Sequence, residues 1–185
     1  MDDRRDDPAA ARRFWRRVPR GRPASREPVG PGEESVWDYP RPPRLERAGR
    51  PVRVELGGRV IARSDRAWRV CETAGPPVYY VPLEDVDAEA LVPSASRSLC
   101  EWKGQARYYD LRAGGRTARD AAFRYAEPEP DFEPLRDAVG FYPGRVDACY
   151  LGEERVRPQP GDFYAGWVTD EIKGPFKGDP GTGHW

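Results

Sequence analysis

A thiol, an ammonium group and a phenol lie close together in the segment Cys100-Glu101-Trp102-Lys103-Gly104-Gln105-Ala106-Arg107-Tyr108-Tyr109. Small side chains within it leave room beside a strand, so we expect this segment to line a ligand pocket. A neighbouring ammonium can lower the pKa of a thiol, which would make Cys100 nucleophilic. The alternative is that Cys100 and Tyr108 are core residues and Lys103 marks a hairpin corner. Thiol catalysis also lacks a base, because the single histidine, His184, lies in a glycine-rich segment.

A second group of polar residues, Arg69, Glu72, Tyr79 and Tyr80, belongs to two neighbouring apolar segments. Desolvation could raise the pKa of Glu72 enough to make it a general base. An ion pair with Arg69, or with another of the many arginines, is the simpler alternative.

Lysine is rare, and each of its three occurrences precedes a glycine. Either a compact ammonium is required at these positions or the dipeptide favours turns.

These observations predict one shared pocket. The expected ligand-binding residues are Arg69, Glu72, Tyr80, Cys100, Lys103, Tyr108, Phe123 and Tyr125. If the site is catalytic, Glu72 or Tyr108 would move a proton and Lys103 would hold an anionic oxygen. Cys100 is a further catalytic candidate, and the catalytic residues stay unassigned.

The acid pair in Asp85-Val86-Asp87 resembles the metal-holding carboxylates of nucleotidyl transfer. The Gly-Ser that grips phosphate in such enzymes is missing, and no P-loop or GxGxxG occurs. The simpler interpretation is a helix start that carries favourable acidic charge.

The elements that would position these groups are short strands. Apolar and polar residues alternate, and turn residues recur every 8–12 positions or so, which predicts a mainly β fold of antiparallel strands. The expected strands are 52–56, 59–63, 68–72, 78–81, 98–102, 106–111, 116–125, 139–142 and 146–151. One or two short helices or turns are expected at 84–91 and 131–137.

The chain has 185 residues with 31 basic and 31 acidic side chains, a balance that excludes a globally basic nucleic-acid binder. The length suggests one domain, and no apolar run approaches the roughly 20 residues of a membrane span. Three cysteines without a CxxC pair argue against a disulfide framework or a zinc site and for a reducing compartment. No signal peptide is visible, so we expect a cytoplasmic protein.

Residues 1–34 are rich in arginine, proline and acid, which predicts a disordered arm. Within it, residues 9–18 could instead form a short basic amphipathic helix. Residues 35–158 are expected to form the domain, with a core at 52–152 and an extended N-terminal arm that buries Trp37. The Gly/Pro-rich tail at 159–185 carries aromatic rings that we expect to dock on the domain.

Several segments together resemble the bacterial family catalogued as domain of unknown function 427. They are Val52–Ile61, Glu72-Thr73, Pro77-Val78-Tyr79-Tyr80-Val81-Pro82, Cys100–Tyr109, Ala121-Ala122-Phe123-Arg124-Tyr125 and Val139-Gly140-Phe141-Tyr142. The flanks, at 34–43 and 161–185, are similar to those of its actinobacterial members. The resemblance implies a compact β-tent like that of the Mss4 proteins, without their zinc cysteines. Some classifications give the family a nucleotidyltransferase label. Phe123 departs from the family's usual tryptophan, so an indole N–H donor is lost there.

We therefore expect a small-molecule-binding β-domain with a pocket near Lys103 and Tyr108. The alternatives are a metal-dependent nucleotidyltransferase that uses Asp85 and Asp87, or a non-catalytic protein-interaction module. Whether the protein is an enzyme stays open. The expected partner is an unknown small molecule, with no cofactor, no membrane and no nucleic acid. The oligomeric state stays open, a homodimer being one candidate.

Overall fold

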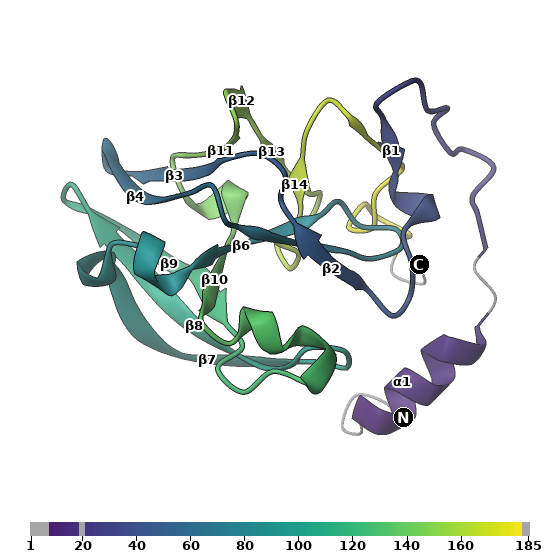
Figure 1. The fold of residues 1–185 in the computed structure, drawn as a ribbon, viewed down its shortest axis with the longest axis horizontal. Coiled ribbons are helices and arrows are strands. Elements are labelled where there is room, and N and C mark those ends of the chain that lie inside the picture. The colour runs from purple at the N-terminus through teal and green to yellow at the C-terminus, as the bar shows by residue number, and fades with distance from the viewer. Residues whose placement is uncertain (1–7, 19–20, 183–185) are drawn as a thin grey trace.

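The computed structural model describes residues 8–18 and 21–182, and its regular structure is mostly β-strand (Figure 1). The strands are β1 (Glu34–Ser35), β2 (Arg44–Arg47), β3 (Val52–Leu56), β4 (Arg59–Ser64), β5 (Trp68–Cys71), β6 (Val78–Pro82), β7 (Leu91–Cys100), β8 (Gly104–Ala113), β9 (Arg116–Arg124), β10 (Ala138–Phe141), β11 (Ala148–Leu151), β12 (Glu154–Arg155), β13 (Arg157–Pro158), β14 (Trp167–Val168) and β15 (Ile172–Lys173). The helical elements are α1 (Pro8–Arg17) and the 3-10 turns η2 (Val36–Asp38), η3 (Leu83–Asp85), η4 (Ala88–Ala90), η5 (Pro130–Leu135) and η6 (Pro143–Arg145). The predicted mainly β class is confirmed; the likeness to the Mss4 β-tent stays a prediction.

Two antiparallel sheets form the body of the domain. The larger has the order β2-β5-β6-β10-β9-β8-β7, and the smaller has the order β12-β11-β3-β4. Figure 1 shows the smaller sheet above the β7–β9 part of the larger one. Val52, Val54 and Leu56 of β3 are fully buried and belong to the main core, as the alternation along that strand predicts.

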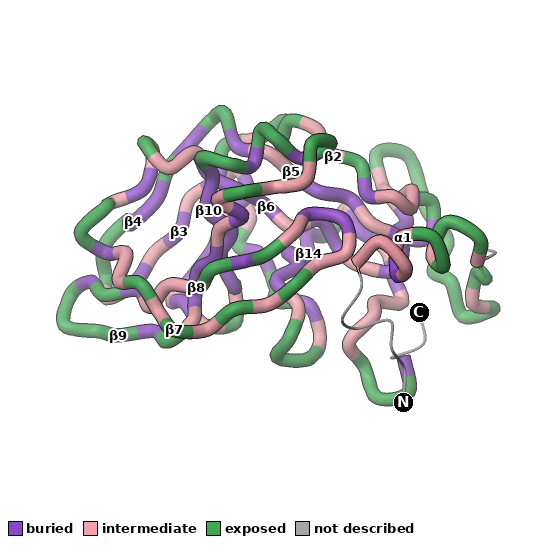
Figure 2. Tube along the Cα trace, turned by 90° about the horizontal axis from the view of Figure 1, so that it is seen from below, coloured by how far each residue is buried: buried purple, intermediate pink, exposed green. Residues whose placement is uncertain are grey.

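The larger sheet is buried on both faces at its inner strand β6. Tyr79 and Val81 belong to the main core, whereas Val78 and Tyr80 belong to a second apolar cluster. Successive side chains of a strand point to opposite faces, so the two clusters lie on opposite sides of this sheet. Figure 2 shows the buried stretches gathered in the interior and the exposed ones in the outer loops. The second cluster, not the main core, carries the candidate site.

Strand β7 begins earlier than the alternation predicts. It covers Leu91–Cys100, and the short helix or turn expected at 84–91 consists of the two 3-10 turns η3 and η4. Pro93 lies inside β7, which is an edge strand, at a shift of register between Pro93 and Arg97. Proline lacks an N–H donor and is tolerated at an edge or a bulge, which explains why a strand continues through it.

The segments before and after the two sheets meet each other. Strand β1 pairs in parallel with β15, and Trp37, which is buried, donates its indole N–H to the carbonyl of Pro175 at 2.9 Å. Helix α1 lies at the periphery, within the arm expected to be disordered, whose residues 1–7 fall outside the described part (Figure 1). Within the described ranges, no helix has the length and apolar character that crossing a membrane requires.

Candidate functional site

A cavity of about 360 Å³ opens on the second apolar cluster, at the face of the larger sheet opposite the main core. Its wall combines residues from β5, β6, β7, β8 and β9 with residues of the C-terminal segment. The lining includes seven of the eight predicted ligand-binding residues, namely Glu72, Tyr80, Cys100, Lys103, Tyr108, Phe123 and Tyr125. Segments far apart in the sequence thus meet at one hollow.

Lys103 lies in the short connection between β7 and β8, which the pairing of Cys100 with Gly104 closes. Gly104 has a φ of 96°, a conformation that favours glycine, and the backbone N–H of Glu129 donates to the Lys103 carbonyl at 3.2 Å. The Lys103 side chain is only 8% exposed, and its ammonium lies 5.7 Å from the centre of the Tyr125 ring. Among the described residues it forms no hydrogen bond or ion pair. A buried cation therefore lines the cavity with an aromatic ring beside it but, among the described residues, no hydrogen-bond or ion-pair partner.

Burial alone would lower the pKa of Lys103. The negative charge that Cys100, Tyr125, Tyr80 and Glu72 can carry acts in the opposite direction, and the net pKa lies well above the usual value. The direction of this shift favours the ammonium form of the side chain. A buried charge is costly unless something pairs with it.

Aromatic rings form much of the wall, with Phe123 in the middle. Its centre lies 5.4–6.0 Å from those of Tyr80, Tyr108, Tyr125 and Tyr142. Gly140 makes room for it, since a Cβ there would lie 2.6 Å from the Phe123 ring. The glycine within the Val139-Gly140-Phe141-Tyr142 motif thus allows this ring to pack against the sheet.

A chain of hydroxyl groups crosses the wall. Ser98 Oγ lies 2.9 Å from the Tyr108 hydroxyl, which lies 3.4 Å from that of Tyr142. The Tyr142 hydroxyl donates to the Phe163 carbonyl at 3.2 Å. Because each hydroxyl has one proton, the donors must point from Ser98 to Tyr108, then to Tyr142 and then to Phe163. The chain thus ties the C-terminal segment to the sheet beside the cavity.

Two polar groups of the wall, the carboxylate of Glu72 and the hydroxyl of Tyr80, differ in whether they have a partner. Glu72 pairs with Arg41, whose Nε lies 3.5 Å from its carboxylate, and not with Arg69. The Tyr80 hydroxyl is buried and has no hydrogen-bond partner in the described ranges. Such an orphaned hydroxyl is uncommon among the buried polar groups of a folded protein.

Five buried phenols resist ionisation, and three of them, Tyr80, Tyr125 and Tyr142, line the cavity. Burial raises the pKa values of Tyr39, Tyr79, Tyr80, Tyr125 and Tyr142 above the usual 10. Above about pH 10 the phenols of the unfolded chain lose their protons, whereas those of the folded chain keep them. The free energy of unfolding is therefore highest below about pH 10 and decreases as pH rises above it. We expect the free energy of unfolding to fall by about 1.4 kcal/mol per pH unit for each such phenol.

Urea unfolding at a series of alkaline pH values measures this slope. The matched control is Tyr80→Phe, which should leave stability at pH 7 nearly unchanged, because it removes a hydroxyl without a partner. The slope of this variant should be smaller than that of the wild type. Equal slopes would mean that Tyr80 does not contribute to the loss of stability at alkaline pH.

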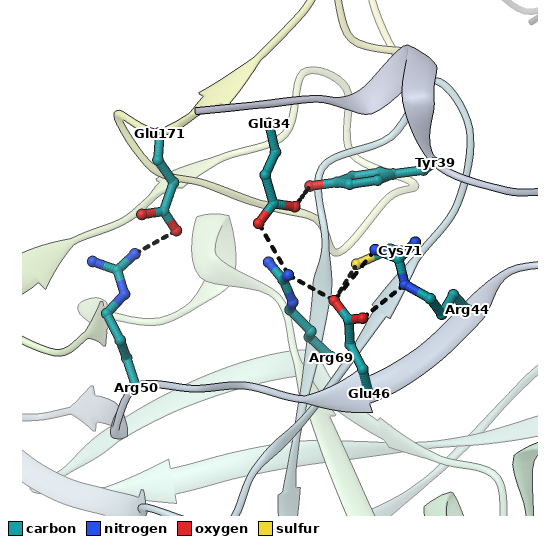
Figure 3. Close-up of polar contacts among 8 residues, drawn as sticks. All are labelled: Glu34, Tyr39, Arg44, Glu46, Arg50, Arg69, Cys71 and Glu171. Atoms are coloured by element: carbon teal, nitrogen blue, oxygen red, sulfur yellow. Dashed lines mark hydrogen bonds and ion pairs between the residues drawn. The ribbon is translucent and has the colours of Figure 1, made fainter. Parts of the chain in front are cut away.

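Arg69 is the one predicted ligand-binding residue that does not line the cavity. It follows Trp68 and precedes Val70 on β5, and it points to the opposite face from Val70, which lines the cavity. There Arg69 pairs with Glu34 at 3.0 Å and with Glu46 at 2.6 Å (Figure 3). The alternation of the strand places it among the residues that hold the N-terminal arm.

We call this group the arm cluster; its members are Glu34, Tyr39, Arg44, Glu46, Arg69 and Cys71. Tyr39 donates to Glu34 at 2.7 Å, and the Cys71 thiol donates to Glu46 at 3.7 Å. Glu34 comes from β1, whereas Glu46 comes from β2, so the cluster connects the arm to the edge of the larger sheet. Its role in the structure is to anchor the arm.

Several wall residues were missed by the sequence reasoning. They are Arg41, Ser98, Tyr142, Gln159, Phe163, Tyr164 and Lys177 among others. Tyr142 stands in a motif already recognised, and Lys177 shares the Lys-Gly pattern of Lys103. The aromatic residues of the C-terminal segment indicate docking on the domain, but only the path of that segment brings them to the cavity.

A family described as a domain of unknown function (DUF427) matches residues 44–152, more than half of the chain. The chain belongs to the DUF427 family. The DUF427 match contains the part of the wall from Val70 to Tyr142, including Lys103, but neither Arg41 nor the C-terminal residues. An Aeropyrum pernix protein, described only as "Protein", is 41% identical over 54 residues, which are 29% of this chain and 23% of that protein. The matched part thus spans less than a quarter of that relative.

Proposed function

We propose that this DUF427 protein binds a small organic anion with an apolar or aromatic body in the cavity at Lys103. The observation that carries this proposal is the buried ammonium of Lys103, which faces the cavity without a hydrogen-bond or ion-pair partner among the described residues. A carboxylate of a ligand would supply the missing charge and the missing acceptors.

The rest of the wall favours a ligand with a ring or an apolar chain. The rings around Phe123 offer flat apolar faces, and the cavity volume lies in the range of small-molecule sites. A few polar groups among apolar ones, as here, are typical of sites that orient a ligand by one anchor. Lys103 would be that anchor.

Asp85 and Asp87, the acids on which the nucleotidyltransferase alternative depends, pair with arginines or cap a turn. Asp85 pairs with Arg66 at 2.8 Å, and Asp87 accepts from the backbone N–H of Glu89 and pairs with Arg59. Neither lines the cavity, and within the described ranges no group of three or more histidine, cysteine or acidic residues could hold a metal ion. These placements favour binding at Lys103 as the proposed function.

Benzoate is the simplest probe of this proposal, with benzyl alcohol as its neutral counterpart. Benzoate at about ten times its Kd should stabilise the protein by about 1.4 kcal/mol in thermal unfolding, whereas benzyl alcohol at the same concentration should not. Lys103→Met should weaken benzoate binding, measured by calorimetry, at least about thirtyfold, which corresponds to about 2 kcal/mol.

The matched control is Lys173→Met, since Lys173 pairs with Glu33 and does not line the cavity. This variant should bind benzoate like the wild type. Lys103→Met itself should unfold with the same free energy as the wild type or a higher one, because it removes a buried charge without a direct partner. Equal stabilisation by benzyl alcohol, or unchanged benzoate binding in Lys103→Met, would refute the proposal.

A further inference from the structure

The three cysteines of the chain have very different surroundings. Cys71 and Cys149 are fully buried, and burial raises the pKa of Cys71 to about 12 and that of Cys149 well above the usual value. Cys100 is only partly buried and lines the cavity. A small reagent that enters the cavity can therefore reach this thiol and not the other two.

The hairpin between β7 and β8 places Lys103 a few residues after this thiol in the chain. Cys100 is the last residue of β7, and its partner Gly104 is the first residue of β8, directly after Lys103. Both side chains line the same cavity, together with the carboxylates of Glu72 and Glu101. The thiolate is the nucleophilic form of a thiol. The ammonium of Lys103 is the buried group that lacks a hydrogen-bond or ion-pair partner among the described residues.

We propose that Cys100 is a thiol–disulfide exchange site for small disulfides that carry a carboxylate. This inference rests on the proposed anion binding at Lys103, which would hold the carboxylate while the disulfide lies against the thiol. The Cys100 thiolate attacks one sulfur of the disulfide, a new sulfur–sulfur bond forms, and the original one breaks. The other half leaves as a thiolate and takes up the proton that Cys100 lost. Cys100 is oxidised to a mixed disulfide and the leaving thiol is reduced.

The mixed disulfide would occupy the cavity and exclude other ligands. An external thiol reverses the step by the same exchange in the opposite direction. Occupation of the binding site would thus depend on the ratio of small disulfide to small thiol around the protein. Cys71 and Cys149 would stay reduced throughout, because burial shields them.

Two disulfide reagents test this inference on the folded protein. Dithiobis(nitrobenzoate) carries a carboxylate on each ring, whereas dithiodipyridine carries no charge. We expect one thiol of the wild type to react fast with the anionic reagent, and peptide mass spectrometry to place the adduct on Cys100. Cys100→Ser should lose the fast phase. Saturating benzoate should lower the rate at which the anionic reagent modifies the wild type. This test does not depend on the folding of any variant.

The rate with the anionic reagent divided by the rate with the neutral one isolates the contribution of charge. Lys103→Met should lower this ratio about tenfold, since attraction to a single cation is lost, and Lys173→Met should leave it unchanged. An unchanged ratio in Lys103→Met, or an adduct on Cys71 or Cys149, overturns the exchange site even if benzoate binding depends on Lys103. Absence of benzoate binding to the wild type overturns the proposed function, and the exchange site with it.

Discussion

Trp167→Ala lowers the free energy of unfolding by about 3–5 kcal/mol, the usual cost of deleting a fully buried aromatic ring. Trp167 is 0% exposed and belongs to the main core, where its ring centre lies 5.0 Å from that of Tyr79. Its indole N–H donates to the Phe141 carbonyl at 3.1 Å, so alanine also removes a buried hydrogen bond. Urea unfolding followed by circular dichroism measures the loss.

Phe163→Ala is the matched control, because it removes another ring of the same segment. Phe163 is 70% exposed, so its loss should change the free energy of unfolding by no more than about 0.5 kcal/mol. Equal costs for the two variants would contradict the placement of Trp167. The expected difference implies that the C-terminal segment is part of the folded core, although the DUF427 match ends at residue 152.

Arg69→Leu should cost about 3–5 kcal/mol, because it leaves the carboxylates of Glu34 and Glu46 without their shared cation. The Arg69 side chain is 15% exposed and pairs with both of them. Arg44→Leu is the matched control within the arm cluster. Its side chain is 46% exposed and pairs with Glu46 alone, so its loss should cost about 1 kcal/mol or less. Urea unfolding of both variants at pH 7 measures the two costs.

The cost of Arg69→Leu should also depend on pH. Burial by itself would raise the pKa of Glu46, but Arg44 and Arg69 lower it, and the net pKa lies below the usual 4.5. Stability from these pairs is thus present above pH 4.5 and is lost as pH falls through the lower folded pKa. The difference between wild type and Arg69→Leu should shrink in acid. A difference that is constant down to low pH would mean that the loss is one of packing and not of charge.

Alternation along single strands predicted much of the fold. In β3 it identified both the strand and the side chains that point inward, and in β5 it identified the strand, because the period of a strand is a local property. The same reasoning missed the first part of β7, which contains Pro93. Only the position of β7 at the edge of a sheet makes that proline acceptable, and edge position is decided by partners far away in the chain.

Part of the candidate site could also be predicted from the sequence, and part could not. Cys100, Lys103 and Tyr108 could be grouped beforehand because a hairpin holds them within a few residues of one another. Glu72 and Tyr80 were grouped as polar residues of two neighbouring apolar segments, and Phe123 and Tyr125 belong to a segment that resembles the family. Arg69 was grouped with them although strand geometry turns it to the other face. The residues that the C-terminal segment adds to the wall, and the lack of a partner for Lys103, follow from long-range packing. A residue's neighbours across a sheet depend on the whole topology, whereas strand type and hairpin contacts depend on short stretches of chain.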